Sequence, residues 1–321
     1  MQEAFRPGLP APRPHLANLW LNLVLLLVTL LTTTALGSRL DYNFRHSLPP
    51  FDLGSDFLVF VEMFHNPSIL LDGLPYSLTL LGILLVHEMG HYLACLFYGI
   101  DASAPYFLPA PAFIGTFGAF IRFRSPVKSR RELFDVGFAG PAAGFAVLLP
   151  ALAVGISLSK AVPGIGASGD LYLGTPLLLR LAEAYAFPGV PTQDIYLHPI
   201  ARAAWVGLLA TALNLLPIGQ LDGGHLVYAM FGEKHRWIST ACIASLVPLG
   251  FLYWPWWIWA AVFYILGRRH FVVVDSQKLG RVRARLMLVA ALIFLLCFIP
   301  APVLYNVERG YAALAPAPLP H

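Results

Sequence analysis

Two histidines and a glutamate lie together in one apolar stretch of the sequence, as His87-Glu88-Met89-Gly90-His91. Residues four apart share one face of a helix, so His87 and His91 can present both imidazoles to a single ion. Glu88 lies beside them, where its carboxylate can take a proton from a water molecule. Zinc lowers the pKa of a bound water to about 7 and polarises a carbonyl group, so the pattern indicates hydrolysis.

The surroundings of this motif favour a metal site over a chance cluster of polar residues. The motif lies in the middle of an apolar block, 76–98, that is long enough to span a bilayer. An ionisable group at mid-membrane costs roughly 2.5–3.5 kcal/mol on insertion scales, so three within five residues need a compensating partner. We therefore expect one zinc ion per chain, and such a site needs a third protein ligand besides His87 and His91.

Asp222 is the strongest candidate for the third ligand, because it lies centrally in another apolar block, 199–231. If both blocks cross the membrane in the same direction, His87 and Asp222 lie at similar depth. At ~1.5 Å per residue, each is roughly 13–17 Å from the same membrane edge. The two side chains can therefore meet across a helix interface.

Three other residues are weighed as ligands. Cys95 continues the helix face of the two histidines, but three ligands from one straight helix rarely converge on a tetrahedral ion. His225 is one turn beyond Asp222 and could bind the metal or orient a substrate. His198 lies at the outer edge of its block, too distant from the expected metal site. The three cysteines all lie in apolar blocks and give no disulfide framework.

The segment around Asp222, NLLPIGQLDGG at 214–224, is expected to break the helix that carries it. Proline and glycine distort a membrane helix, and irregular backbone at membrane depth is tolerated where it is buried in protein or lines a wet cavity. Hydrolysis needs such access for water. Asn214 has two interpretations: it donates a hydrogen bond to a substrate carbonyl or a developing oxyanion, or it makes a hydrogen bond between helices.

The composition sets the environment in which these residues act. Of 321 residues, 58% are hydrophobic and only 12% are charged, whereas soluble domains carry about 25% charged residues. We therefore predict an all-α polytopic membrane protein surrounded by the lipid bilayer. The net charge of +4 lies in clusters between apolar blocks. No basic-aromatic strip accompanies these clusters, so we expect no nucleic-acid partner.

About seven membrane segments are predicted from the apolar blocks: 19–37, 76–98, 133–157, 199–231, a hairpin of two short spans within 237–267, and 286–304. The first block is longer than the apolar core of a usual signal peptide, so we interpret it as a retained span. The stretch 57–64 could lie on the membrane surface, and 158–198 is expected to be a polar loop. Glycines at the start of the third span, Gly137, Gly140 and Gly144, would let a neighbouring helix approach closely.

The distribution of basic residues predicts the orientation. With the N-terminus inside, 15 of the 21 Lys and Arg residues fall on the cytosolic side and six fall outside. This imbalance favours a cytosolic N-terminus and an external C-terminus. Since no transit peptide is evident, we expect a multi-pass protein of the cytoplasmic (cell) membrane rather than of an organelle.

Two motifs in this order resemble those of the site-2 protease family of intramembrane zinc metalloproteases. They are H-E-x-x-H and, in a later span, N-x-x-P-x-x-x-x-D-G, which begins at Asn214. The resemblance covers about 76–231. It implies zinc held by His87, His91 and Asp222, with Glu88 as the general base. It also implies transmembrane protein substrates, cut near the cytosolic face.

The family resemblance also suggests an organisation for the chain. It implies a small membrane-associated β-hairpin after the first motif, and 105–123 has the turn signals and aromatic residues for one. An unwound substrate could add a strand to its edge. The segment 158–198 is too short for a PDZ domain, so the chain resembles the PDZ-lacking branch. We divide it into 1–75 (tail, first span and external loop), 76–231 (protease core) and 232–321 (hairpin, last span and tail).

Two other functions are considered beside the protease. A metal or ion transporter also places polar groups in its spans, but it has no need of Glu88 and often shows inverted repeats; we find no repeat here. A non-catalytic relative that binds membrane proteins would be expected to lack a ligand or the base, and this chain has all four residues.

Overall fold

The computed structural model describes residues 16–51, 61, 63, 65–110, 114–266 and 279–305, which are mostly helical. The α-helices are α1 (Leu16–Arg45), α3 (Leu74–Phe97), α4 (Arg130–Ser157), α5 (Ile165–Ser168), α6 (Leu177–Ala186), α7 (Pro199–Asn214), α8 (Asp222–Phe231), α9 (His235–Leu249), α10 (Pro255–Leu266) and α11 (Arg281–Cys297). Short 3-10 helices are η1 (Pro67–Gly73), η2 (Thr192–Asp194) and η3 (Gly232–Lys234). The strands are β1 (Tyr106–Pro109), β2 (Thr116–Phe120), β3 (Lys160–Ala161), β4 (Leu171–Leu173), β5 (Ile195–Tyr196) and β6 (Val303–Tyr305).

Three of the described helices are long and apolar enough to cross a membrane: Leu19–Arg45, Pro67–Phe97 and Arg130–Ser157. They correspond to the first three predicted spans. The later predicted segments are shorter helices, and a helix needs about 20 apolar residues to span a bilayer. By length and composition, the described chain therefore has three helices of spanning size, compared with the seven segments predicted from the sequence.

The fourth predicted segment is divided in two, as its prolines and glycines led us to expect. α7 ends at Asn214 and α8 begins at Asp222, with turns between them. Gly219 adopts a positive φ of 53° in this connection, a conformation that costs glycine little. A Cβ at Gly224 would lie 2.7 Å from the carbonyl oxygen of Ile218. The tight connection therefore requires glycine at this point.

The last predicted segment is wrong at its C-terminal end. We predicted a span at 286–304, but α11 ends at Cys297 and the chain then forms β6. Pro300 and Pro302 lie between them, and proline in a helix interior disfavours the helix because it lacks a backbone N–H and its ring clashes with the preceding turn. β6 pairs antiparallel with β4, so the apolar residues after Pro302 form a strand instead of a membrane helix.

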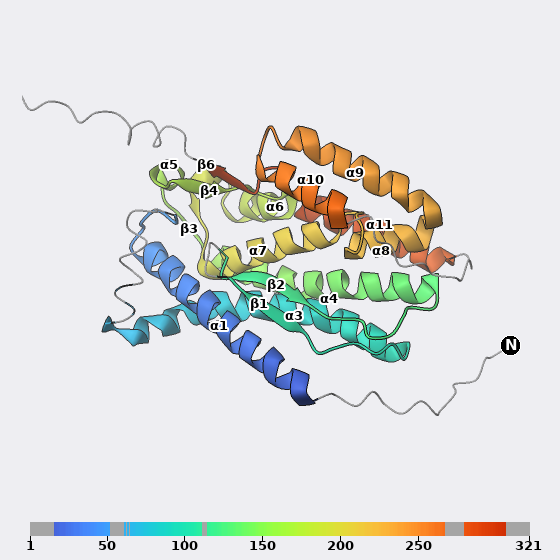
Figure 1. The fold of residues 1–321 in the computed structure, drawn as a ribbon. Coiled ribbons are helices and arrows are strands. Elements are labelled where there is room, and N and C mark those ends of the chain that lie inside the picture. The colour runs from blue at the N-terminus through green and yellow to red at the C-terminus, as the bar shows by residue number, and fades with distance from the viewer. Residues whose placement is uncertain are drawn as a thin grey trace, which may run out of the picture.

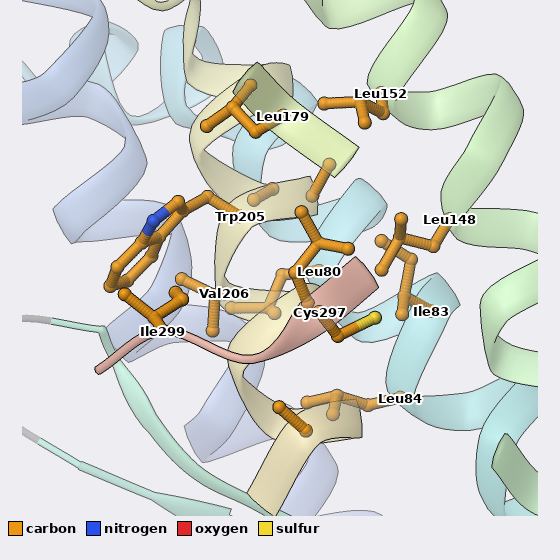
Figure 2. Packing of buried hydrophobic residues seen from close by; sticks show 14 of the residues in the cluster. Leu80, Ile83, Leu84, Leu148, Leu152, Leu179, Trp205, Val206, Cys297 and Ile299 are labelled. Atoms are coloured by element: carbon orange, nitrogen blue, oxygen red, sulfur yellow. The ribbon is translucent and has the colours of Figure 1, made fainter. Parts of the chain in front are cut away.

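The centre of the molecule is a bundle in which α4 packs against both α3 and α7 (Figure 1). Figure 2 shows leucines of α3 and α4 converging with Trp205 of α7 and Cys297 at the end of α11. Lipid is as apolar as leucine, so close backbone approach between helices contributes much of their association. Gly90 illustrates this: a Cβ there would lie 2.5 Å from the carbonyl oxygen of Ala139.

The aromatic segment after α3 forms β1 and β2, which pair antiparallel with Tyr106 opposite Phe120. Polar side chains of the neighbouring helices hold this region. The Asn22 amide of α1 donates to the carbonyl oxygen of Ala104 at 2.9 Å, and the Tyr76 hydroxyl of α3 donates to that of Ile114 at 3.0 Å. The two strands are thereby fixed beside α1 and α3, close to the first motif.

Residues 158–198 are more ordered than the polar loop we predicted. They contain β3, α5, β4, α6, η2 and β5, which gather at the end of the bundle where α7 begins (Figure 1). Their strands have only two or three residues, too short for a periodic pattern to mark them. The predicted surface stretch at 57–64 lies largely outside the described residues.

Candidate metal centre

The H-E-x-x-H motif lies on α3, where both histidines point toward the same place. The two Nε2 atoms of His87 and His91 are 3.2 Å apart. His87, Glu88 and His91 are all nearly inaccessible, with 5–6% of their surface exposed. The helical spacing that the sequence suggested therefore brings the two imidazoles together in a buried position.

Asp222 joins this pair from the first turn of α8. Its two carboxylate oxygens each lie 3.3 Å from one imidazole nitrogen, Oδ2 from Nε2 of His87 and Oδ1 from Nε2 of His91. One ligand atom from each residue lies within 4.8 Å of the others. The break between α7 and α8 makes this possible, because it starts a new helix at Asp222 beside the histidines.

The chemistry of these atoms fits a divalent cation. The Nδ1 of His91 is 2.8 Å from the Val136 carbonyl oxygen, so we assign the ring proton to Nδ1 and a lone pair to Nε2. The ligand atoms of His87, His91 and Asp222 point their lone pairs at one another. They repel unless a positive charge lies between them. Two imidazole nitrogens and one carboxylate form a ligand set used by catalytic zinc sites, with a fourth position left for water or substrate.

Glycines of α4 provide the room for the two histidines. A Cβ at Gly140 would overlap the His91 imidazole, lying within 2.5 Å of its Cδ2. A Cβ at Gly144 would lie 3.0 Å from the Cβ of His87. The glycines predicted to allow close helix approach are thus confirmed in that role, and two of them lie directly against the candidate ligands.

Glu88 lies next to the metal group without belonging to it. Its neighbour in sequence, His87, points to the group, whereas the Glu88 carboxylate lies near the backbone of Ile121, directly after β2. The end of β2 is therefore close to this carboxylate. A carboxylate that is buried, close to the metal group and outside its ligand set can exchange protons with a water there.

Asn214, the last residue of α7, also reaches the group. Its Nδ2 lies 3.3 Å from Nε2 of His87. The amide thus meets the ligand atom of a histidine on another helix. This places Asn214 between α7 and α3 and beside the metal group. A hydrogen bond from Asn214 to a substrate carbonyl stays a prediction.

The other weighed ligands lie outside the group of three formed within the described residues. Cys95 is fully buried in a small apolar cluster with Ile100 and Val136. His225 is buried one turn further along α8. His198 caps the N-terminus of α7, where its Nδ1 accepts a hydrogen bond from the Ile200 N–H at 3.2 Å.

Two contributors to the site were missed by sequence reasoning. They are the Val136 carbonyl, which bonds His91, and the backbone of Ile121, which lies near Glu88. Both are backbone groups, which every residue type possesses. Residue types give no signal for such groups. Only the packing of α4 and the hairpin against α3 places them there.

The protein family of this chain follows from its match to a known family model. Residues 75–253 match the model of peptidase family M50, which is more than half of the chain and includes the whole metal group. The chain belongs to peptidase family M50. The predicted resemblance to site-2 proteases is thereby confirmed.

Several relatives of this M50 chain are named as zinc metalloproteases. A probable zinc metalloprotease, EGY1, chloroplastic, from Arabidopsis thaliana is 34% identical over 71% of this chain and 43% of its own length. The rice protein of the same name is 29% identical over 89% of this chain and 52% of its own length. EGY2 of Arabidopsis thaliana is 34% identical over 63% of this chain and 36% of its own length. The chain thus spans about half or less of these relatives.

Proposed function

We propose that this protein is an intramembrane zinc-dependent endopeptidase that hydrolyses peptide bonds in or near the transmembrane segments of membrane proteins. The observation that carries the proposal is the buried group of His87, His91 and Asp222 beside the Glu88 carboxylate. Polar residues inside a membrane are functional as a rule. Membership of peptidase family M50 and similarity to probable zinc metalloproteases support the same activity.

Each residue has a role in this proposal. His87, His91 and Asp222 hold one zinc ion, which when bound supplies Lewis acidity at the peptide carbonyl. Glu88 takes a proton from the attacking water and returns it to the leaving amine. Asn214 donates its amide hydrogens toward the carbonyl oxygen, where negative charge develops. The Val136 carbonyl holds the His91 ring so that Nε2 faces the metal.

The hairpin supplies a place for the substrate. A helical peptide bond is shielded by its own backbone and must be extended before attack. We propose that β1 and β2 form a membrane-associated hairpin, and that an unwound substrate adds to its edge by main-chain hydrogen bonds. The proximity of Ile121 to Glu88 supports this proposal, because the end of β2 then lies near the proposed base.

We further propose a topology and a division of the chain. The N-terminus lies in the cytosol and the C-terminus outside the cytoplasmic membrane, as the excess of Lys and Arg on one side favours. About seven segments contact the membrane, with 76–231 as the protease core between the regions 1–75 and 232–321. The match of the M50 family to 75–253 supports a core of about this extent.

Replacing Glu88 by glutamine tests the function. The amide keeps the size of the side chain but cannot accept the proton, so we expect zinc content to stay at about one per chain. Cleavage of a tagged single-span membrane protein in detergent should fall about 10²–10⁴-fold. Glu233→Gln, the same change at an exposed residue beyond α8, should match the wild type.

The zinc content and the cleavage rate together separate the alternatives. A wild type that binds zinc but cleaves no member of a substrate panel would favour a transporter or a non-catalytic binding protein. A wild type without zinc would contradict the metal site itself. Full activity of Glu88→Gln would remove Glu88 from its proposed role.

A further inference from the structure

A second site lies at the end of the bundle where α7 begins, away from the metal group. There the short elements β4, α6, η2 and β5 enclose a cavity of about 630 Å³. This volume is within the range of small-molecule binding sites. None of the metal-group residues lines it. Along α7, at ~1.5 Å per residue, the cavity residue Arg202 is roughly 18 Å from Asn214, so the two sites are separate.

One buried carboxylate of this cavity has an oxygen atom without a hydrogen-bond partner. Glu183, on α6, exposes only 3% of its surface and lines the cavity. Its Oε2 atom has no hydrogen-bond partner. A buried carboxylate with an unpaired oxygen is unfavourable unless something binds it. α6 also has an exposed face, which carries Tyr185, yet the charged Glu183 lies on the buried face of the same helix.

Arg202 provides a cation in the same cavity. It exposes 6% of its surface, and its Nε donates to the Leu197 carbonyl oxygen at 3.1 Å. Its guanidinium carbon lies 5.7 Å from the Phe51 ring and 5.3 Å from the Tyr196 ring. When the face of an arginine guanidinium stacks on aromatic rings, the N–H groups at its edge can still donate two hydrogen bonds to a carboxylate.

The two charged groups do not neutralise each other. Within the described residues, Arg202 and Glu183 form no ion pair with one another. Glu183 interacts electrostatically with Arg180, whereas Arg202 interacts with Arg39, Tyr76 and Tyr196. A ligand that satisfies both groups must carry an ammonium for the carboxylate and a carboxylate for the guanidinium. The cavity lining also includes apolar residues, Ile165, Leu171 and Leu179 among them.

We propose that this cavity binds a small zwitterion with an apolar side chain, either a free α-amino acid or a short peptide. The ammonium of the ligand contacts Glu183, its carboxylate contacts Arg202, and its side chain packs among the leucines. The site does not depend on proteolysis, and the geometry that supports it shares no residue with the metal group.

The protonation of Glu183 gives a first test. Burial raises the pKa of the Glu183 carboxyl to about 7, against the opposing effect of the Arg180 guanidinium. The stability contributed by the protonated group is therefore present below about pH 4.5 and is lost as the pH rises through about 7. Without ligand, we expect the melting temperature of the wild type to fall relative to Glu183→Gln between about pH 5 and 8. The other charged lining residues, Asp194 and Arg202, are unchanged in that variant, so parallel profiles would show that Glu183 is not buried as described.

Ligand binding is best measured on full-length Glu88→Gln protein in detergent, by calorimetry and thermal shift, since this protein does not cut peptides. The probes are L-leucine, the dipeptide Leu-Leu, 4-methylpentanoate without the ammonium, isopentylamine without the carboxylate, and uncharged N-acetyl-leucinamide. We expect saturable binding of leucine or the dipeptide, and binding at least about tenfold weaker for each analogue that lacks a charge. The stronger of the two zwitterions identifies the free amino acid or the peptide as the source.

Three variants added to this background make the test decisive. Glu183→Gln should weaken zwitterion binding about tenfold or more. Thr192→Trp places a large side chain at an exposed lining residue and should block the cavity while keeping the fold. Glu233→Gln, remote and exposed, should bind as the parent does. The proposal is wrong if no zwitterion binds saturably, if N-acetyl-leucinamide binds equally well, or if folded Glu183→Gln and Thr192→Trp both bind like the parent.

Discussion

Alanine at Gly140 is expected to cost the protein most of its zinc and nearly all of its activity. The added methyl group would overlap the His91 imidazole, which the Val136 carbonyl holds in place. Either the ring turns and loses that hydrogen bond, or α3 and α4 move apart. Loss of a group that orients a ligand lowers metal affinity about 10–100-fold, and a displacement of about 1 Å at the site can reduce the rate about 100-fold. Zinc titration and cleavage assays measure both effects.

Gly82→Ala is the matched control for this change. Gly82 lies on α3, on the same helix as the motif, but a Cβ there would meet no atom within 4 Å. Alanine is also the better helix former, so stability should stay the same or rise slightly. Normal zinc content in Gly140→Ala would mean that the helices accommodate the methyl group, and the close packing described for His91 would be wrong.

Asp222→Asn is expected to have an effect of similar size through the ligand itself. The amide keeps the shape of the side chain but removes the negative charge that faces both imidazoles at 3.3 Å. Since loss of an orienting group alone lowers affinity about 10–100-fold, loss of a charged ligand should lower it by at least about 100-fold. Cleavage should fall in parallel and should not recover at moderate zinc concentration.

Cys95→Ala provides the comparison for Asp222→Asn. Cys95 was the rival ligand on the same helix face, yet it lies buried in an apolar cluster with Ile100 and Val136. Its replacement leaves a small cavity and lowers stability modestly, but zinc content should remain at about one per chain. Loss of zinc from Cys95→Ala, with zinc retained by Asp222→Asn, would reverse the two assignments.

The sequence predicted the metal ligands and the helix break, because both depend on distinctive residue types. His87 and His91 follow helical spacing, and Asp222 was found by its charge within an apolar block. The break before it was evident from Pro217 and Gly219. These features depend on residue types, so they can be read without the fold, and the structure brings all three candidate ligands together.

Other features depend on packing or on short elements, and the sequence did not predict them. The Val136 carbonyl orients His91 through a backbone atom that every residue possesses. The strands within 158–198 are too short to show periodicity, so that segment was interpreted as a loop. Apolar composition continued past Cys297, and it concealed that Pro300 and Pro302 turn the chain into β6.

The long separation between the two halves of the metal group has a consequence for biosynthesis. His87 and Asp222 are 135 positions apart along the chain. At ~5–20 residues per second, a ribosome needs roughly 7–27 s to proceed from one to the other. A nascent chain that already carries the histidine pair therefore still lacks its acidic ligand. Under the proposed function, the site could become competent for hydrolysis only after α8 has reached α3, when more than two thirds of the chain has been made.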